Sequence, residues 1–469
     1  MMRFNLRRSF ILPLVVFAGI ALLRGNSLTP AAEEARKDDA AAATERPYPS
    51  LPGAVRECPE WLKKNAPFDV GEWFQVVPPE ENAAPLYLDA LYEFAPRDME
   101  KCMPPATIAA RGAVINYRAA RTGEGLNANP PALSSDLIAE YLVAFDKIRL
   151  AQRHKRCVFE TGLGFEALLP HAQSSRAVVR VLDWRVEYAV ANGQIDAAIA
   201  DIGLGLRLSR DLRPRGYIIS QLVSIALDSV ILQSPVSKIL AAPGLTIAQC
   251  DRLLQILARH SDEAVDSLPE GFRCEYVTLR DILHRYEMGS ETVAALMLDE
   301  QVHTVLEGFT AADFEAEVDA LNRFFRPLVE RRPRPIGEYA QTAPDQQRAA
   351  TELKALSSLL AAVPQFVEAC RRDLTRIPGT RCLVAVRRWQ LDHDGKSPPN
   401  LSAACKAAGM NGVPIDEYSP TGEPLRYITI DGDFVVYSVA LDGADDGAKM
   451  DWNFGRSAGD WIFRLSPLR

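Results

Sequence analysis

The chain has 469 residues, of which 48% are hydrophobic and 24% are charged. These fractions are typical of globular proteins and exclude a collagen, a wholly disordered chain and a polytopic membrane protein. At about 150 residues per domain, the length favours two or three domains. The net charge is −8, and without its first 32 residues the chain has 49 basic against 61 acidic residues, a net of −12. This acidity, with no long run of Lys or Arg, argues against nucleic-acid binding.

The N-terminus has the order of an export signal. A basic segment, Met1–Arg8, precedes an apolar run, Ser9–Leu23, that is short for a membrane span. We therefore expect residues 1–23 to be a signal peptide or an N-terminal anchor, with a buried N-terminal helix as the alternative. The protein would be exported and periplasmic, or anchored to the cytoplasmic membrane by this segment, which would be its only membrane contact. Residues 24–56, rich in Ala, Pro, Glu and Arg, are predicted to be a disordered tether.

Residues 57–377 are predicted to form an α-helical body. Apolar residues recur every three or four positions in a series of segments, which predicts amphipathic helices. The predicted helices are 175–192, 195–206, 217–240, 246–260, 272–286, 311–329 and 345–372. Asn192-Gly193 leaves so short a turn between the first two that they must lie antiparallel. This turn and the start of the next helix resemble those of tetratricopeptide-like repeats, so the body is interpreted as antiparallel helical hairpins in a repeat-like arrangement.

Two pairs of side chains in this body suggest an alternative function. Asp281 and His284, and Glu300 and His303, each place a carboxylate and an imidazole on one helical face, a spacing that di-iron bundles use. A metal-dependent enzyme with a carboxylate/histidine site in the body is the alternative, although acids and histidines on solvated helix faces produce the same spacing. The sequence contains no Gly-x-Ser-x-Gly elbow and no Walker loop.

The eight cysteines are scattered, and no Cys-x-x-Cys motif occurs. Cys250/Cys274 and Cys382/Cys405 are pairs that lie close in sequence, and these are the first disulfides to test. Buried free thiols explain the same pattern, since a chain of this size does not need cross-links.

The C-terminal segment, 378–469, is predicted to be a small α+β domain. Pro378-Gly379 marks its start, followed by short helices at 380–391 and 401–408. Strands are predicted at 425–430 and 434–440, joined by a tight turn at Asp431-Gly432-Asp433, and 461–465 can pair as a third strand.

The order of motifs in this segment resembles the soluble head of type II secretion pseudopilins. The motifs are a helix ending at Trp389, an Asp416–Tyr427 segment with Gly422 and Pro424, a Tyr437-Ser438 strand and an Asp/Gly-rich loop from Asp442 to Gly447. The match covers about a fifth of the chain. The compact Asp-Pro of those heads is replaced by Asp416-Glu417-Tyr418-Ser419-Pro420, and their cleavage site and N-terminal stalk are missing. The order of export signal, helical body and C-terminal segment is also similar to that of exported proteins of bacteria such as planctomycetes.

The resemblance implies a calcium site, because the corresponding loop of the major pseudopilins binds calcium. The residues agree in part, since carboxylates on a Gly-containing loop suit Ca²⁺. The candidate ligands are Asp442, Asp445, Asp446, Asp451 and Asp460. The alternative is a solvated acidic turn.

Together these patterns predict a mainly α protein with a pseudopilin-head-like α+β domain at its C-terminus. The expected function is that of an exported, envelope-associated, non-enzymatic scaffold or protein-interaction protein. Its partner would be a protein of the cell envelope.

Overall fold

The computed structural model describes residues 48–55, 57–95, 99–103, 139, 141–164, 167–289, 300–330, 344–430, 433–449 and 459–463. The predicted export segment, most of the tether and Asp451 lie outside these residues. The protein is mainly helical, with a small antiparallel sheet near the C-terminus, as the sequence predicted.

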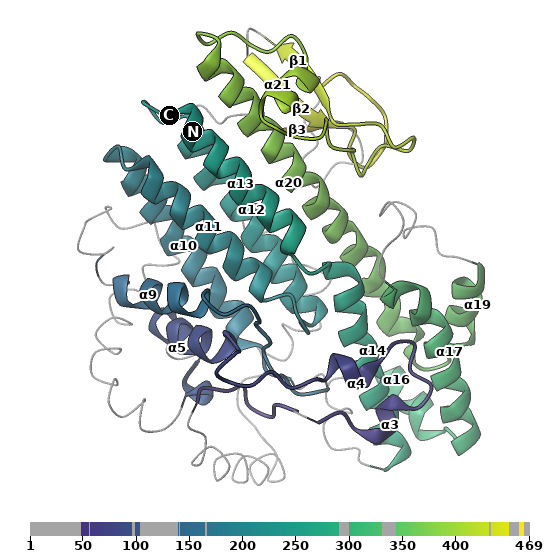
Figure 1. The fold of residues 1–469 in the computed structure, drawn as a ribbon. Helices are drawn as coiled ribbons and strands as arrows, with labels where there is room; N and C mark the ends of the chain where they lie inside the picture. Colours follow the sequence, from purple (N-terminus) through teal and green to yellow (C-terminus); the bar gives the residue numbers. More distant parts are fainter. Residues whose placement is uncertain are drawn as a thin grey trace.

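Long helices that lie side by side form the centre of the molecule (Figure 1). They are α10 (Pro170–Ala191), α11 (Ile195–Asp211), α12 (Ile218–Leu240), α13 (Ile247–Glu263) and α20 (Val363–Asp392). Helices α11, α12, α20 and α13 pack on one another in this order around a ring, and α10 covers α11 and α12. Ion pairs at both ends of α11 and α13, Asp196–Arg252 and Arg210–Glu263, show that these two helices run parallel.

Other helices cover this bundle on two sides. Helices α5 (Ala84–Phe94) and α9 (Leu142–Ala151) pack together beside α10 and α11, and the short η1 (Glu100–Cys102) lies between them in the chain. The other side holds α14, α16, α17 and α19, with α3 and α4 against α14 (Figure 1). Their bounds are Ser267–Glu287, Glu300–Glu307, Ala311–Val329, Pro344–Glu352, Glu60–Lys63 and Val70–Trp73.

The local sequence explains where several helices begin. The side chains of Thr246 and Thr310 each accept a hydrogen bond from the backbone N–H three residues later, and Gln249 and Asp313 return one. These reciprocal bonds satisfy backbone donors that a helix start leaves unpaired. Helix α12 is apolar enough to cross a membrane by length and composition. In this fold most of its residues are buried against α10, α11 and α20, which makes it a core helix.

Two separate apolar cores fill the molecule. One contains residues of α5, of the five helices from α9 through α13, of the C-terminal half of α20, of the short α21 (Leu401–Ala407) and of the sheet. The other joins α3, α4, α14, α16, α17, α19, the 3-10 helix η2 (Leu356–Ala362) and the N-terminal half of α20. Cys370 belongs to the second core and Ile377 to the first, so α20 passes from one to the other between these residues.

The continuity of α20 contradicts two helix predictions. The sequence predicted one helix over 345–372 and a separate one from 380, with a break at Pro378-Gly379. The structure instead has α19 and η2 before Val363, and then one helix through Pro378 to Asp392. Pro378 costs one backbone hydrogen bond, but packing on α12, α13 and the sheet holds the helix together. The boundary predicted at 377/378 therefore falls inside a helix.

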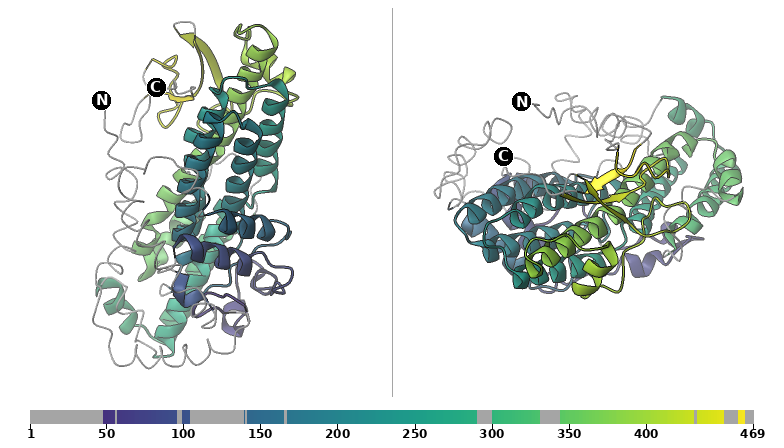
Figure 2. Two further views of the ribbon diagram at one scale, coloured as in Figure 1. Left: turned by 90° about the vertical axis from the view of Figure 1, so that its left-hand side faces the viewer. Right: turned by 90° about the horizontal axis from the view of Figure 1, so that it is seen from above.

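A three-stranded sheet packs on the C-terminal half of α20, near the short α21 (Leu401–Ala407). The strands β1 (Arg426–Ile430), β2 (Asp433–Ser438) and β3 (Trp461–Phe463) follow the order β1-β2-β3, with both pairs antiparallel. The side views place this sheet at one end of the upright helices (Figure 2). The hairpin and the third strand are as predicted.

Candidate functional site

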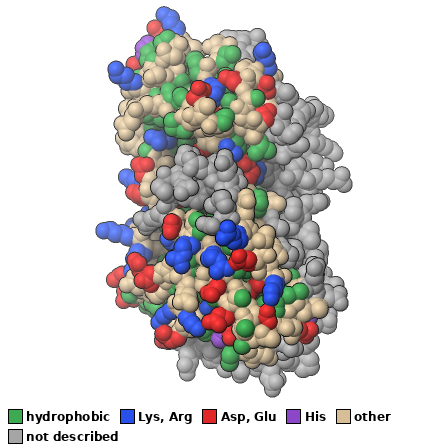
Figure 3. Space-filling view, turned by 90° about the vertical axis from the view of Figure 1, so that its right-hand side faces the viewer, with side chains coloured by type: hydrophobic (Ala, Val, Ile, Leu, Met, Phe, Trp, Pro, Cys, Tyr) green, Lys and Arg blue, Asp and Glu red, His purple; other side chains and the backbone are tan. Residues whose placement is uncertain are grey.

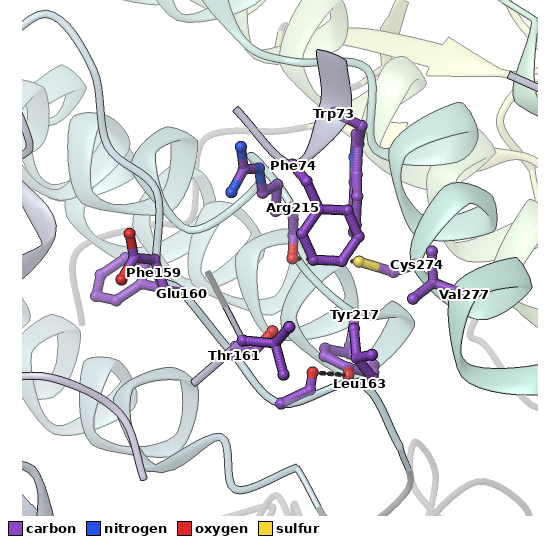
Figure 4. Close-up of a pocket in the computed structure, with 12 residues that line it drawn as sticks. Trp73, Phe74, Phe159, Glu160, Thr161, Leu163, Arg215, Tyr217, Cys274 and Val277 are labelled. Carbon is purple, nitrogen blue, oxygen red and sulfur yellow. Dashed lines mark hydrogen bonds between the residues drawn. The ribbon is translucent and has the colours of Figure 1, made fainter. Parts of the chain in front are cut away.

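The structure contains a small cavity that is too tight for a substrate. It lies near Trp73, Phe74 and Tyr217, and its volume of about 20 Å³ suffices for one water molecule. Figure 4 shows the Tyr217 hydroxyl bonded to the Gly162 carbonyl, and the Cys274 Sγ bonds to the Arg215 carbonyl at 3.2 Å. These polar groups have partners in the protein, so the cavity is a feature of packing.

A much larger groove, of about 890 Å³, runs between α9, α11 and α13. We call it the basic groove. The residues that line it are Arg149, Gln152, Lys155, Ala200, Gly203, Leu204, Leu206, Arg207, Arg210, Arg252, Gln255, Ile256, Arg259, His260 and Glu263. Six are Lys or Arg and one is acidic, so the groove reverses the sign of a chain whose net charge is −8.

Helical periodicity explains how these residues meet. Ala200, Gly203 and Arg207 on α11 stand three or four positions apart, and Arg252, Ile256 and Arg259 repeat this spacing on α13. Residues at such spacing share one face of a helix. Because α11 and α13 run parallel, the two faces lie side by side, with their apolar residues as the floor and their arginines along the walls. The end of α9 and the residues after it close the groove with Arg149 and Lys155.

Carboxylates hold the inner arginines in place. Arg207 Nε donates to Asp211 Oδ2 at 2.8 Å, and the buried Tyr87 hydroxyl donates to the same oxygen at 2.7 Å. Burial lowers the pKa of Arg207, but the interaction with Asp211 raises it by more, so the net shift is upward. Arg210 pairs with Glu263, and burial lowers its pKa. Both guanidiniums remain cationic, since no ordinary shift deprotonates arginine.

Two outer cations, Arg252 and Arg259, pair with exposed carboxylates. Arg252 bonds to Asp196 at 3.1 Å, with side chains that are 48% and 65% exposed. Arg259 is 75% exposed and lies 3.8 Å from Glu263. Surface pairs of this kind contribute about 0–1 kcal/mol each. A ligand carboxylate or phosphate can therefore replace the protein partner at little cost.

His260 connects the groove to a buried polar cluster at the junction of the two apolar cores. Its Nε2 lies 3.0 Å from Asp228 Oδ2. Arg213 donates to that same oxygen at 2.6 Å, to Asp373 Oδ2 at 2.9 Å and to Ser267 Oγ at 3.0 Å. The cluster joins α12, α13, α14 and α20 with charged side chains that are at most 6% exposed.

The two carboxylates of this cluster have opposite pKa shifts. Burial raises the pKa of Asp228, but His260 and Arg213 outweigh it and the net shift is downward. Burial and the nearby Asp228 raise the pKa of Asp373, and the cations do not fully offset them. Arg213 therefore bridges Asp228, whose pKa is lowered, and Asp373, whose pKa is raised.

Surface charge is not segregated everywhere. On the face that carries α17 and α19, Lys and Arg side chains are interspersed with Asp and Glu (Figure 3). Such a mixed surface is ordinary for a soluble protein. The concentration of cations in the basic groove is thus a local feature.

The predicted calcium ligands that the structure describes bond to the protein itself. Asp445 accepts from Tyr437 and Gly447 and pairs with Arg426 at 2.9 Å, and Asp442 accepts from Ala444 and Gly459. The buried Asp460 accepts from Ala448, and burial raises its pKa. Asp446 is near this carboxyl, and Asp451 lies outside the described residues. Among the described residues no three such side chains form a metal-binding group. Calcium binding stays a prediction.

The side chains of the alternative metal site also have other contacts. Asp281 Oδ2 pairs with Arg285 at 2.8 Å, and His284 stacks on Trp61 with ring centroids 4.3 Å apart. His303 contacts the Tyr286 hydroxyl at 2.7 Å and Glu307 at 3.2 Å. The side chain of Glu300 lies outside the described residues. These contacts do not support a shared metal site.

All eight cysteines are free thiols in this structure, and seven are buried. Cys250 belongs to the first apolar core, whereas the Cys274 thiol lies beside the Arg215 carbonyl, outside that core. Cys382 and Cys405 are neighbours whose thiols interact across α20 and α21. Of the two pairs suggested by sequence, only the second is brought together.

Sequence reasoning missed the basic groove because its cations are far apart in the chain. Arg149, Arg207 and Arg259 come from three helices that are far apart in the sequence. The local signals were the basic stretch 147–156 and the exposed faces of α11 and α13, where basic residues recur at helical spacing.

Comparison with models of protein families, with curated proteins and with solved structures found no significant match to this chain.

Proposed function

We propose that this chain is an exported, envelope-associated, non-enzymatic scaffold or protein-interaction protein, and that the basic groove binds its partner. The groove itself carries the proposal: six cations surround about 890 Å³ in a chain of net charge −8. A local reversal of charge attracts and orients a partner of opposite sign.

The lining of the groove supports binding more than catalysis. Its described lining residues include no Ser, Thr or Cys, and the lining carboxylate Glu263 is paired with Arg210. The inner arginines are fixed by Asp211 and Glu263, which suits recognition of a charged surface. His260 bonds to Asp228 in the core, so its ring has a structural role.

Export is supported by the N-terminal sequence. The order of basic residues, apolar run and polar tether in residues 1–56 is that of a signal peptide or an uncleaved anchor. We propose that the helical part is periplasmic, either free or tethered to the cytoplasmic membrane. The thiol pair Cys382/Cys405 is compatible with an oxidising compartment.

Two finer aspects of the fold belong to the same proposal. The α10/α11 hairpin and the parallel α11 and α13 support a relation to helical repeats, in which equivalent helices stack in parallel.

In the C-terminal segment, Asp416 accepts from Ser438 Oγ at 2.7 Å and from Val439 N at 2.9 Å. This bond links two of the motifs that resemble pseudopilin heads, which supports treating them as one unit.

The experiment compares two variants of the full-length chain with the same change in charge. The groove variant carries Lys155→Glu, Arg252→Glu and Arg259→Glu. The control variant carries Lys64→Glu, Lys396→Glu and Lys406→Glu, all exposed and outside the groove. Each is tagged, cross-linked in cells and purified from the envelope fraction by gentle extraction.

We expect the wild type and the control to elute in a complex with an envelope protein, and the groove variant to elute without it. A wild-type chain that elutes alone and monomeric contradicts the proposed function. A complex that persists in the groove variant contradicts the assignment of the groove.

A further inference from the structure

The dimensions of the basic groove set the size of its ligand. Its walls extend from the Asp196–Arg252 pair to the Arg210–Glu263 pair. The segment of α11 between these pairs is about 21 Å long at about 1.5 Å per residue. An extended peptide covers this length with about six residues. A single small anion would occupy only part of it.

The floor of the groove is apolar and made of small or aliphatic residues. Ala200 and Gly203 present almost no side chain, and a Cβ on Gly203 would lie 3.5 Å from Ile256 Cδ1. Leu204 and Ile256 line the same floor. An apolar floor of this kind favours contact with an aliphatic side chain, because the contact removes apolar surface from water.

The rim supplies charge at several points along the groove. Lys155, Arg252 and Arg259 are exposed. The pairs Arg252–Asp196 and Arg259–Glu263 are exposed as well. These cations suit carboxylates that stand on both sides of a buried aliphatic side chain. Glu263 and the acidity of the whole chain disfavour a long polyanion such as a nucleic acid.

We propose that the basic groove binds an acidic peptide segment whose carboxylates flank an aliphatic side chain. Carboxylates pair with the rim cations Lys155, Arg252 and Arg259, while the aliphatic side chain lies over Gly203 against Ile256. This inference rests on the proposed function and adds the chemistry of the partner. A polymer of phosphate alone would pair with the rim cations but has no apolar group that could contact the floor.

The test selects peptides with the purified full chain. A displayed library of random 12-residue peptides is selected on the wild type, and the best binders are synthesised with a fluorescent label. Their affinities are measured by anisotropy for the wild type, for the groove and control variants, and for two floor variants, Gly203→Leu and Ala200→Leu. Inorganic polyphosphate is the competing probe. Thermal melting identifies any variant that does not fold, and Ala200 is exposed, so at least one floor variant remains usable.

We expect enriched peptides to combine Asp or Glu with Leu, Ile or Val. Their affinity should fall at least tenfold in the groove variant and in a folded floor variant, and should stay unchanged in the control. Enrichment of peptides without acids overturns the inference, and so does unchanged binding in the floor variants. A library without binders, alongside groove-dependent binding of polyphosphate, overturns it as well. Because this test uses purified protein, its result is independent of whether an envelope complex is recovered.

Discussion

Asp228 on α12 and His260 on α13 share a hydrogen bond of 3.0 Å while both side chains are almost completely buried. Arg213 donates to the same carboxylate and to Asp373 on α20. Buried charges are tolerated only where they are paired and hydrogen-bonded. The bond therefore belongs to a cluster that fixes α12, α13, α14 and α20 to one another where the two apolar cores meet.

Removing the shared carboxylate should strongly destabilise the fold. Asp228→Ala leaves Arg213 and His260 buried with fewer partners, and the loss of one partner from a buried ion pair costs about 3–5 kcal/mol. Urea unfolding followed by circular dichroism measures this. The matched control is Asp196→Ala, which removes an exposed pair and should cost less than about 1 kcal/mol. Equal effects of the two changes would refute the importance of the cluster.

The two glycines of Gly203-Leu204-Gly205 should respond oppositely to alanine. At Gly203 a Cβ meets Ile256 at an ordinary 3.5 Å, so Gly203→Ala should stabilise α11 by about 0.5–1 kcal/mol. At Gly205 a Cβ would lie 2.8 Å from Ile231 Cδ1 and 3.0 Å from Leu182 Cδ1, so Gly205→Ala should destabilise by about 1–3 kcal/mol. The midpoints of thermal unfolding give both signs. If both substitutions stabilised the protein, α10 and α12 would lie farther from Gly205 of α11 than the structure shows.

Gly379 allows the C-terminal sheet to pack on α20. A Cβ there would lie 2.6 Å from Cζ of the buried Phe463. Gly379→Ala should cost about 1–3 kcal/mol by overpacking, and Phe463→Leu should recover part of this loss in the double variant. Fluorescence of Trp461, whose ring centroid is 4.8 Å from that of Phe463, reports on the sheet. Additive effects of the two changes would argue against direct contact.

The buried His171 should make stability depend on pH. Burial lowers the pKa of its imidazole to about 3, against about 6.5 in the unfolded chain. Below pH 6.5 the unfolded chain binds a proton that the folded one does not, so stability falls with pH toward about 3. The slope approaches 1.4 kcal/mol per pH unit.

Other groups titrate in the same range, so the measurement is a difference between proteins. Burial raises the pKa of Glu275 to about 7, and this carboxyl stabilises the fold as pH falls from about 7 toward 4.3. Urea unfolding of the wild type and His171→Asn between pH 7 and 5 isolates the histidine. The variant should lose less stability than the wild type on acidification, and parallel curves would contradict the assignment.

Much of the fold could be predicted from periodicity and capping. The apolar spacing and the N-cap Thr246 predicted α13, and α17 was predicted with its observed limits, Ala311–Val329. The break at Pro378 was not correct, because a local rule for proline was outweighed by packing on both sides of α20. Thr246 acts on its own neighbours, whereas the fate of Pro378 depends on residues far away in the sequence.

The candidate site could not be predicted in the same way. Arg207 and Arg259 are separated by about fifty residues, and only the parallel packing of α11 and α13 brings them to one groove. In the Asp-rich loop, which the sequence offered as a candidate calcium site, Asp445 and Asp442 accept hydrogen bonds from Tyr437 and backbone donors, and Asp445 pairs with Arg426. Local patterns show which groups are present, and tertiary contacts decide which of them remain available.

The sequence by itself determined that this protein is mainly helical, acidic and preceded by a segment of export-signal pattern, because composition and periodicity act over a few turns of chain. Only the tertiary structure decided that α20 joins two cores, that Asp228, His260, Arg213 and Asp373 form one cluster, and that scattered cations line one groove. These features depend on which helices lie side by side. That choice follows from burial of apolar surface over the whole chain, which no short stretch of sequence specifies.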